Sequence, residues 1–463
     1  MSLDLDTQAI MMSHLTAKKD VLAFMRTNRA HYDAGFQRLL QFRVVVHDRR
    51  LEDFCDFMLS GSIPRLPGLH QISFVYGWGL FRNPAKAHIV GRLVSVLQGA
   101  RHIKKLDITH CEDFLKLDPQ IGSAITSLEH LESLLLHNAT QGLSLGLLKN
   151  LTSSVTTLDL AIYLERPLTF PEDDIRAAPT SAIATLALSL ENLTLHRTSL
   201  AGNTIQFPKV KSLIMNESHG PDKACLAHTF PNLQRLSFET ANHNYSMDRD
   251  EAREQRQVNR SVDQGDKATT LKFLSARLID IYSWGFSGEF EEMIITEVLQ
   301  YQHGMLPVVL NDALPRKLEL NLSASQTSSY QFVQLLPDSI APRLEELRMN
   351  IEMRMYDSDE GYSDLLTQID QMLRARPGLP FIRSIQIRLI ATGLRFKTSD
   401  GGKRSFGDAD DYLLRLLPRK AAKNLLRNAP SLRNICIILE KSTGRRERIH
   451  FRVCEGELVQ LPK

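Results

Sequence analysis

Pro231-Asn232-Leu233-Gln234-Arg235-Leu236-Ser237-Phe238 is the stretch of sequence that decides the fold. Its pattern is Pro-x-φ-x-x-φ-x-φ, in which φ is an apolar residue and x is any residue. The last two φ residues alternate at period two, as on a short strand with one buried face. Proline suits the position before such a strand, because its backbone torsion is fixed and it donates no hydrogen bond.

The same pattern recurs along the chain. One such unit cannot bury its apolar face alone, so the copies must stack side by side as a parallel sheet with a continuous core. The pattern resembles the leucine-rich repeat, L-x-x-L-x-L, over roughly residues 66–440. Including the stretch above, the ten copies have as their first φ residue Leu69, Ile103, Leu131, Val155, Leu190, Val210, Leu233, Leu344, Ile382 and Leu432.

The repeats are irregular in length. Most steps between first φ residues are 20 to 50 residues, but the step from Leu233 to Leu344 is 111. Steps of about 20–29 residues match the usual repeat length, so longer steps require inserted helices or loops. The longest must contain degenerate repeats, an insertion, or both. An ordinary α/β domain is the alternative, but the same spacing persists through both halves and favours a repeat fold.

Amphipathic helices are predicted between the strands. Residues 48–60 have apolar side chains at helical spacing, and residues 89–96, 121–128 and 366–373 behave likewise. Alternation of strand and helix implies parallel pairing with right-handed crossovers. We predict the first strand at residues 72–74, after the helix at 48–60.

The N-terminal residues 1–42 read as three short helices. Ile10-Met11-Met12-Ser13-His14-Leu15-Thr16, followed by Lys19-Asp20-Val21-Leu22-Ala23-Phe24-Met25-Arg26-Thr27-Asn28-Arg29-Ala30, resembles an F-box. An F-box beside irregular leucine-rich repeats is typical of the large fungal F-box/leucine-rich-repeat families, which the chain resembles.

This resemblance implies a function. In that family the F-box helices bind the Skp-type adaptor of a cullin-RING ubiquitin ligase, and the repeats bind the protein substrate. A stand-alone repeat scaffold, whose N-terminal helices only cap the solenoid, is the alternative. By resemblance, and by apolar burial, the partner-binding residues are expected to be Ile10, Leu15, Val21, Leu22, Phe24 and Met25.

The expected fold class is therefore α/β: an irregular leucine-rich-repeat solenoid preceded by a small three-helix F-box-like unit. Three parts are predicted, namely an F-box-like unit at 1–42, a repeat domain at 43–440 and a C-terminal capping segment at 441–463. A polar segment at 241–270 is predicted to be an exposed insertion, and 397–411 a second polar loop. Each is either a contact loop for a partner or a tolerated surface loop.

Composition excludes several classes of protein. The 463 residues are 43% hydrophobic and have a net charge of +3, which predicts no nucleic-acid partner. There is no signal-peptide pattern at the start and no apolar run near 18 residues, so no membrane association is expected. The five cysteines are scattered, which disfavours a disulfide framework. We predict an intracellular protein, cytoplasmic or nuclear.

Signatures of catalysis are missing from the sequence. It contains no phosphate-binding loop, no G-x-S-x-G elbow and no H-E-x-x-H motif, so we expect no enzyme, no cofactor and no metal. His102, His110 and Cys111 are interpreted as ordinary residues rather than metal ligands, and the acidic residues of 289–292 as a solvated charged face.

Two aromatic residues have two interpretations. Trp284 and Phe286 would suit a hot spot for a substrate if they faced the open surface of the repeats. Aromatic residues of the core are more common, and we favour that interpretation.

Overall fold

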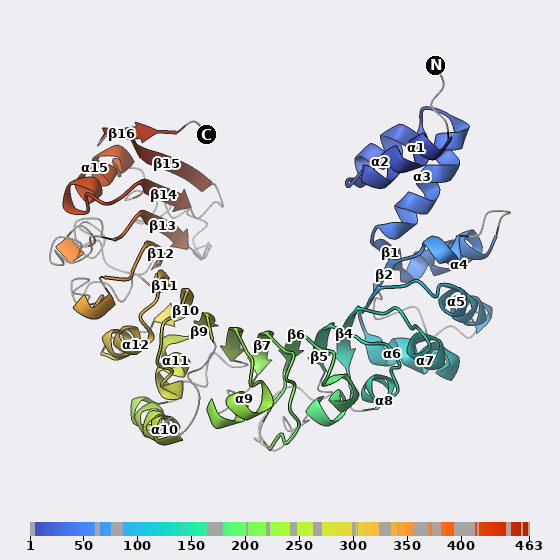
Figure 1. Cartoon of the computed structure of the whole chain (residues 1–463), viewed down its shortest axis with the longest axis horizontal. Coiled ribbons are helices and arrows are strands. Elements are labelled where there is room, and N and C mark those ends of the chain that lie inside the picture. Colours follow the sequence, from blue (N-terminus) through green and yellow to red (C-terminus); the bar gives the residue numbers. More distant parts are fainter. Residues whose placement is uncertain are drawn as a thin grey trace, which may run out of the picture. The chain divides into compact units, whose positions relative to one another are not determined.

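The protein is described here by a computed structural model of the whole chain, drawn in Figure 1. It forms two compact units, one of residues 1–221 and 225–232 and the other of residues 222–224 and 233–463. The residues that the structure describes are 5–60, 65–75, 87–140, 142–163, 179–200, 202–218, 223–240, 248–262, 271–298, 302, 304–323, 335–340, 342–354, 369, 371–372, 381–392, 413, 416–440, 446–454 and 457–461.

The first unit begins with three helices and continues as a parallel sheet, with helices along one face of the sheet (Figure 1). Each strand from β1 to β6 pairs in parallel with the next one in sequence. The elements are α1 (Leu5–His14), α2 (Lys18–Met25), α3 (Arg29–Gln41), β1 (Val44–His47), η1 (Asp48–Arg50), α4 (Leu51–Leu59), η2 (Leu66–Gly68), β2 (Gln71–Val75), α5 (Ala87–Gly99), β3 (Lys105–Ile108), α6 (Cys111–Lys116), α7 (Pro119–Thr126), β4 (Ser133–Ala139), α8 (Leu143–Lys149), β5 (Thr157–Ile162), η5 (Pro179–Ser181), η6 (Ala184–Leu186), β6 (Asn192–His196) and β7 (Ser212–Ser218).

The second unit repeats the same plan, and α9 (Lys223–Thr229) lies in the segment where the two units divide. Its strands β8 to β14 are parallel where their pairing is described, with helices again along one face (Figure 1). The elements are β8 (Arg235–Thr240), α10 (Arg249–Val262), β9 (Phe273–Ala276), α11 (Leu278–Trp284), β10 (Glu292–Val298), α12 (Met305–Ala313), β11 (Lys317–Ser323), η10 (Asp338–Ile340), β12 (Glu346–Arg354), β13 (Ser384–Thr392), α15 (Pro418–Asn428), β14 (Asn434–Glu440), β15 (Arg446–Cys454) and β16 (Glu457–Gln460).

The φ residues form the core in both units, as the repeat pattern predicts. Strand pairing aligns the second φ residue of successive copies, and the third likewise, so that each makes a continuous buried row. Every member of the row of second φ residues is at most 1% exposed. In the first unit this row is Ile72, Leu106, Leu134, Leu158, Leu193 and Leu213, and in the second unit it is Leu236, Leu274, Met293, Leu318, Leu347, Ile385 and Ile435. Parallel strands with buried φ rows and helices between them make each unit an α/β repeat of the leucine-rich type.

The prediction of the first strand was wrong. A strand, β1, precedes the helix α4 and pairs with β2, aligning Val44 with Ile72 and Val46 with Phe74. It escapes the pattern because its lead-in position is Gln41, a polar residue where the other copies have an apolar one. The predicted helix at 48–60 is confirmed, as η1 followed by α4.

The predicted exposed insertion at 241–270 was also partly wrong. Its residues 249–262 form the helix α10, and Ala252, Arg256 and Asn259 are buried in it. Arg256 donates from Nη1 to the carbonyl oxygen of Tyr282 at 2.7 Å, and Asn259 donates to that of Ser283 at 2.9 Å. A polar helix can therefore pack here because its buried polar groups meet backbone oxygens of α11. The rest of the long step holds β9, β10 and β11.

Several strands of the first unit end in the same unusual backbone conformation. Four residues each lie two positions after the last apolar residue of a repeat pattern, and their backbone N–Cα torsion angles are positive, 48° to 56°. They are His110, Asn138, Arg197 and Glu217. This left-handed conformation costs a non-glycine residue roughly 1–2 kcal/mol. It shifts the alternation by one residue, so the next residue points inward: Cys111, Ala139, Thr198 and Ser218 are at most 1% exposed.

The C-terminal segment departs from the parallel pattern. β15 pairs antiparallel with β14, and β16 pairs antiparallel with β15. An antiparallel hairpin occupies the edge of the sheet that a further parallel repeat would need. This is the described part of the predicted capping segment 441–463. The predicted polar loop at 397–411 lies outside the described residues.

Candidate functional site

The three N-terminal helices have a hydrophobic core of their own. Met12, Val21 and Met25 are buried in it, at 3%, 0% and 5% exposure. Leu15 and Phe24 pack against this core, with three apolar residues of 36–42. Asn28 caps α3 by accepting a hydrogen bond from the backbone N–H of His31 at 2.8 Å, so the turn between α2 and α3 is fixed by its own residues.

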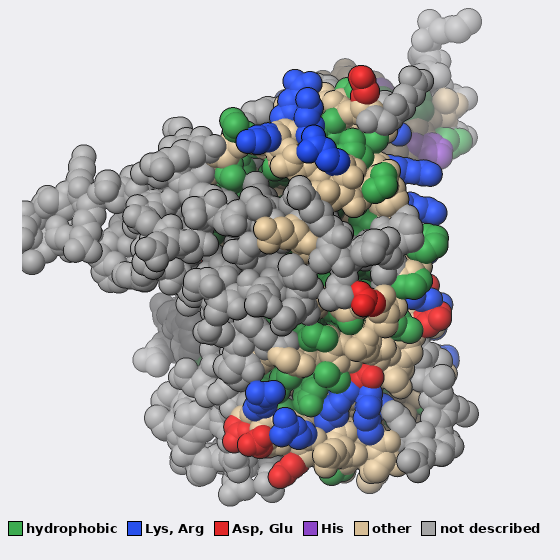
Figure 2. Space-filling model, turned by 90° about the vertical axis from the view of Figure 1, so that its left-hand side faces the viewer, with side chains coloured by type: hydrophobic (Ala, Val, Ile, Leu, Met, Phe, Trp, Pro, Cys, Tyr) green, Lys and Arg blue, Asp and Glu red, His purple; other side chains and the backbone are tan. Residues whose placement is uncertain are grey.

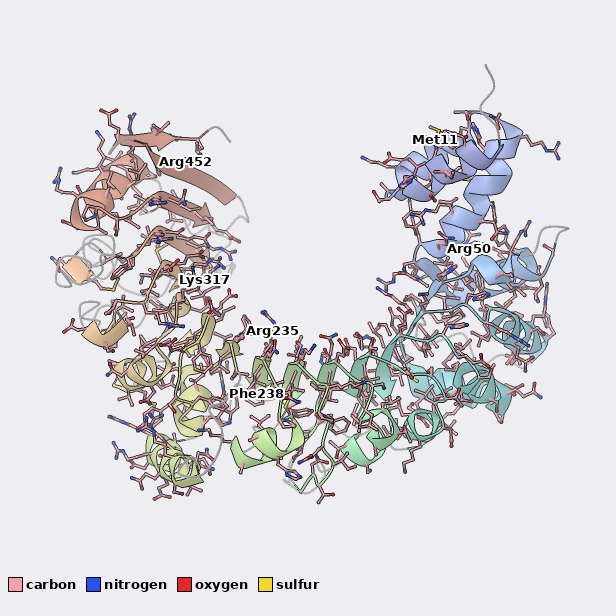
Figure 3. All side chains as sticks on the ribbon, in the orientation of Figure 1. Met11, Arg50, Arg235, Phe238, Lys317 and Arg452 are labelled. Carbon is pink, nitrogen blue, oxygen red and sulfur yellow. The ribbon has the colours of Figure 1, made fainter. Side chains whose placement is uncertain are left out.

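Other apolar residues of these helices face solvent. Ile10 is 60% exposed, Met11 43%, Leu22 43% and Tyr32 53%. We call these four residues the apolar surface of the helical unit; Figure 3 labels Met11 on it. Each of the three helices thus presents at least one large apolar side chain to solvent that a protein partner can bury.

The six residues predicted to bind a partner therefore divide into three groups. Ile10 and Leu22 are exposed and belong to the apolar surface. Leu15 and Phe24 are partly buried, with Phe24 stacked on the ring of His31 at 4.1 Å between centroids. Val21 and Met25 are buried in the core, so they cannot contact a partner and only stabilise the packing of the helices that carry the exposed residues.

The helical unit joins the repeats through α3. The ring of Phe36 lies 5.1 Å from that of Phe57 in α4, and the Arg65 guanidinium lies over both rings. Leu40 is buried at the same junction, where a Cβ on Gly68 would come within 3.4 Å of it. The contact uses α3, so Leu22 in α2 remains exposed in the full chain.

A second candidate surface is the face of the sheet opposite the helices, which we call the open face. In the second unit it carries charges aligned by strand pairing: Glu292, Lys317 and Glu346 lie side by side on β10, β11 and β12. Lys317 Nζ is 3.2 Å from Glu346 Oε1. Arg348 reaches three carboxylates at 3.5–3.9 Å, on β10, β11 and β12. Figure 3 shows Lys317 on this face.

The residues immediately before these strands also alternate in charge from one strand to the next. Arg316 Nε is 2.9 Å from Glu345 Oε1, and its Nη1 is 3.5 Å from Glu291 Oε2. The hydrogen bond from Arg316 lowers the pKa of Glu345. Because such exposed pairs are screened by water, they contribute little to stability. The acidic residues around Glu291 thus form a solvated charged face, as predicted.

The open face of the first unit is built differently. Asp107 Oδ2 accepts hydrogen bonds from Ser73 Oγ at 2.8 Å and from Arg43 Nη2 at 2.6 Å. Farther along, His196 Nε2 lies 3.2 Å from Asp159 Oδ1, and the ring of His137 lies 6.4 Å from that of His196. The described residues of this face are a mixture of buried and half-buried polar groups and include no run of one charge.

Buried ionisable groups in the described parts serve the fold. Glu112 accepts hydrogen bonds from the backbone of Leu143 and from the backbone and hydroxyl of Ser144, all within 3.1 Å, and so holds the start of α8. Burial opposes ionisation of Glu112, but these hydrogen bonds prevail and lower its pKa. Burial raises the pKa of Asp280, despite its two hydrogen bonds from Arg277.

No group of three or more His, Cys, Asp or Glu side chains that could hold a metal ion occurs among the described residues. His102 is exposed, with its ring 5.5 Å from that of His130, whereas Cys111 is buried. Burial raises the pKa of the Cys111 thiol to about 12, which makes it a poor nucleophile.

Trp284 and Phe286 belong to the core. They are 3% and 6% exposed, and the Trp284 ring meets that of Phe238 edge-on at 5.3 Å. Figure 3 shows Phe238 on the helix side of the sheet, away from Arg235 on the open face. The interpretation as core aromatics is confirmed, and the hot-spot interpretation is excluded.

Comparison with known proteins identifies no family for this chain. No protein-family model matches the chain, and no curated protein matches it. Among solved structures, a leucine-rich-repeat protein of Leptospira interrogans is similar over 81% of this chain and 86% of its own, with 12% identity and a TM-score of 0.28. Among the described residues, none of the helices has the length and apolar character that crossing a membrane requires.

Proposed function

We propose that this chain is a non-catalytic adaptor whose N-terminal helices bind a Skp-type adaptor protein and whose repeats recruit a protein substrate for ubiquitination. The observation that carries the proposal is the apolar surface of the helical unit. Ile10, Met11, Leu22 and Tyr32 are 43–60% exposed on helices that already have a complete core. Complete burial of a fully exposed side chain of this kind releases about 1.5–3 kcal/mol, so burial of these half-exposed ones releases roughly half as much each.

The identity of the partner rests on the resemblance of residues 10–30 to an F-box. Leu22 follows Asp20 and Val21 in the part of the sequence that resembles the F-box pattern. The buried Val21 orients α2, and the exposed Leu22 would then meet the adaptor. The open faces of the repeats, with their half-exposed charged side chains, would meet the substrate.

A second function is favoured by the junction at α3. Phe36 and Leu40 pack against the start of the repeats, as expected if the helices only cap the solenoid of a stand-alone scaffold. A cap needs this junction but has no use for exposed apolar residues on α1 and α2. The two functions therefore differ in what the apolar surface does.

A pull-down of the purified full-length protein with a purified Skp-type adaptor distinguishes them. Ile10→Asp and Leu22→Asp place a charge on the apolar surface without entering the core. Leu188→Asp is the matched control, because Leu188 is 71% exposed elsewhere in the first unit. Circular dichroism verifies that every variant is folded.

The adaptor function predicts that wild type and Leu188→Asp bind, and that binding falls at least about tenfold in Ile10→Asp and Leu22→Asp. Absence of binding by the wild type, with all proteins folded, would overturn it and leave the scaffold with a helical cap.

A further inference from the structure

The near-neutral net charge conceals an uneven distribution. Residues 415–452 contain 11 Lys and Arg but only 2 Asp and Glu, whereas the rest of the chain contains 45 and 51. This segment includes α15, β14 and most of β15. Like charges at such density repel one another, so a partner that supplies the opposite charge gains free energy by binding there.

The helix α15 gathers four of these cations on its exposed side. Arg419, Lys423 and Arg427 recur every fourth residue and so form one stripe, about 12 Å long at the rise of an α-helix, with Lys420 beside it. Together these four residues are the basic surface. All four are exposed, whereas Ala422 and Leu425 on the other side are buried. Figure 2 shows a group of Lys and Arg side chains near the top of the second unit.

The described residues do not neutralise this basic surface. Within the described ranges, no carboxylate pairs with any of its four side chains, whereas Lys317 and Arg348 on the open face have carboxylates within 4 Å. Two further exposed cations, Arg433 and Arg452, lie on β14 and β15 or immediately before them; Figure 3 labels Arg452. The cations of α15 are thus available to an external anion.

We propose that the basic surface of α15 binds an acidic segment of a protein partner. The spacing of the stripe matches the spacing of carboxylates on a peptide. Residues four apart on a helix are separated by about 6 Å along its axis, and alternate residues of an extended chain are separated by about 6.6 Å. The proposal rests on the proposed function in one respect, namely that the repeats recruit a protein; it adds that an acidic segment of that protein binds α15 on the helix side of the second unit, in addition to the contacts made by the open face.

The structure favours a protein over other anions. α15 contains no aromatic residue on which a nucleic-acid base could stack. Its inner apolar residues are used in the core, and the exposed Leu417 at its N-cap alone is too little apolar surface to hold the helix in a bilayer. The helix α12 of the same unit contains no Lys or Arg. The basic surface therefore has four cations on one helix, fewer than the six to ten phosphate contacts, roughly, that a duplex-binding protein makes.

Fluorescence anisotropy with full-length protein tests the proposal. The probe is a fluorescein-labelled peptide of alternating Glu and Ser residues, and its competitors are a single-stranded oligonucleotide and phosphatidylserine vesicles. One variant carries Arg419→Gln, Lys420→Gln, Lys423→Gln and Arg427→Gln. The control carries Gln at four exposed lysines of the first unit, which lowers the net charge equally: Lys116, Lys149, Lys209 and Lys211.

We expect the peptide to bind the wild type and the control alike, and the α15 variant at least about tenfold more weakly, with a smaller dependence on salt. Equal weakening in both variants would overturn the proposal, because net charge alone would then explain binding. So would preferential binding of the oligonucleotide or the vesicles.

The adaptor pull-down is independent of this result. It depends on residues of α1 and α2, so the α15 variant should still bind the Skp-type adaptor if that function holds. Failure of either experiment therefore leaves the other interpretable.

Discussion

Replacement of Arg256 by Leu is expected to destabilise the second unit by about 3 kcal/mol. The Arg256 side chain is 7% exposed, donates to the Tyr282 carbonyl oxygen at 2.7 Å and forms an ion pair with Asp312. Each hydrogen bond to a charged group contributes about 1.5–3 kcal/mol when its loss leaves a buried partner unsatisfied. The two interactions of Arg256 together would contribute about 3–6 kcal/mol. Arg260 still pairs with Asp312 in the variant, and the cost of burying the guanidinium disappears, so we expect a loss at the low end of this range.

The assay is urea unfolding followed by tryptophan fluorescence. The chain has two tryptophans, and Trp78→Phe as a common background leaves Trp284 of α11, beside α10, as the reporter. Arg253→Leu is the matched control, because Arg253 is on the same helix and pairs with Asp250 at 3.3 Å, but both side chains are more than half exposed. It should cost less than about 1 kcal/mol.

Two results would refute this reasoning. If Arg256→Leu changed stability by less than about 1 kcal/mol, the buried ion pair would not hold α10 in place. If Arg253→Leu were equally damaging, burial would not be what distinguishes the two arginines.

Three further predictions concern buried side chains. Because hydrogen bonds lower the pKa of Glu112 below the ordinary 4.5, its ionised form stabilises the fold above that pH and the contribution is lost on acidification. Glu112→Gln should therefore cost about 1–3 kcal/mol at neutral pH and progressively less in acid, as urea midpoints at several pH values would show; a pH-independent cost would contradict this. Burial raises the pKa of Cys55 to about 11 and of Cys111 to about 12, so neither thiol should react with maleimide until urea unfolds the protein; prompt labelling in mass spectra would refute their burial. Trp284→Ala should lose about 3–5 kcal/mol by leaving a cavity beside Phe238, and wild-type thermal stability in this variant would be inconsistent with a core position.

The φ pattern predicted the core because burial constrains those positions in every repeat. Among the strands that were not predicted, two have a pattern that contains an unusual residue. The strand β1 has Gln41 at its lead-in position, and β9 ends its pattern in Ala276, a small residue. In both strands pairing with a neighbour buries the apolar side chains that the pattern alone did not reveal.

The polar helix α10 was missed for a different physical reason. Its buried Arg256 is matched by Asp312, 56 residues later in the chain. Composition indicates only that the segment is polar, since a partner this distant becomes apparent only when the two helices are adjacent. The charges of the open face are similar: Glu292 and Lys317 become neighbours only through strand register.

The exposed residues of the N-terminal helices were predicted in part. Helical spacing identified the apolar residues but not which of them face inward, because three short helices can pack in more than one way. In the structure Val21 is buried whereas its neighbour Leu22 is exposed, and Met11 and Tyr32 are also exposed, which was not anticipated.

The left-handed residues at the strand ends have a consequence for how the chain tolerates insertions. His110, Asn138, Arg197 and Glu217 all turn the backbone at the same step after the last φ residue. Strand register is therefore complete before the connecting segment begins, and the length of that segment does not affect it. New sequence can enter beyond the buried residue that follows this turn without disturbing the core, which is how repeats of such unequal length share one sheet architecture.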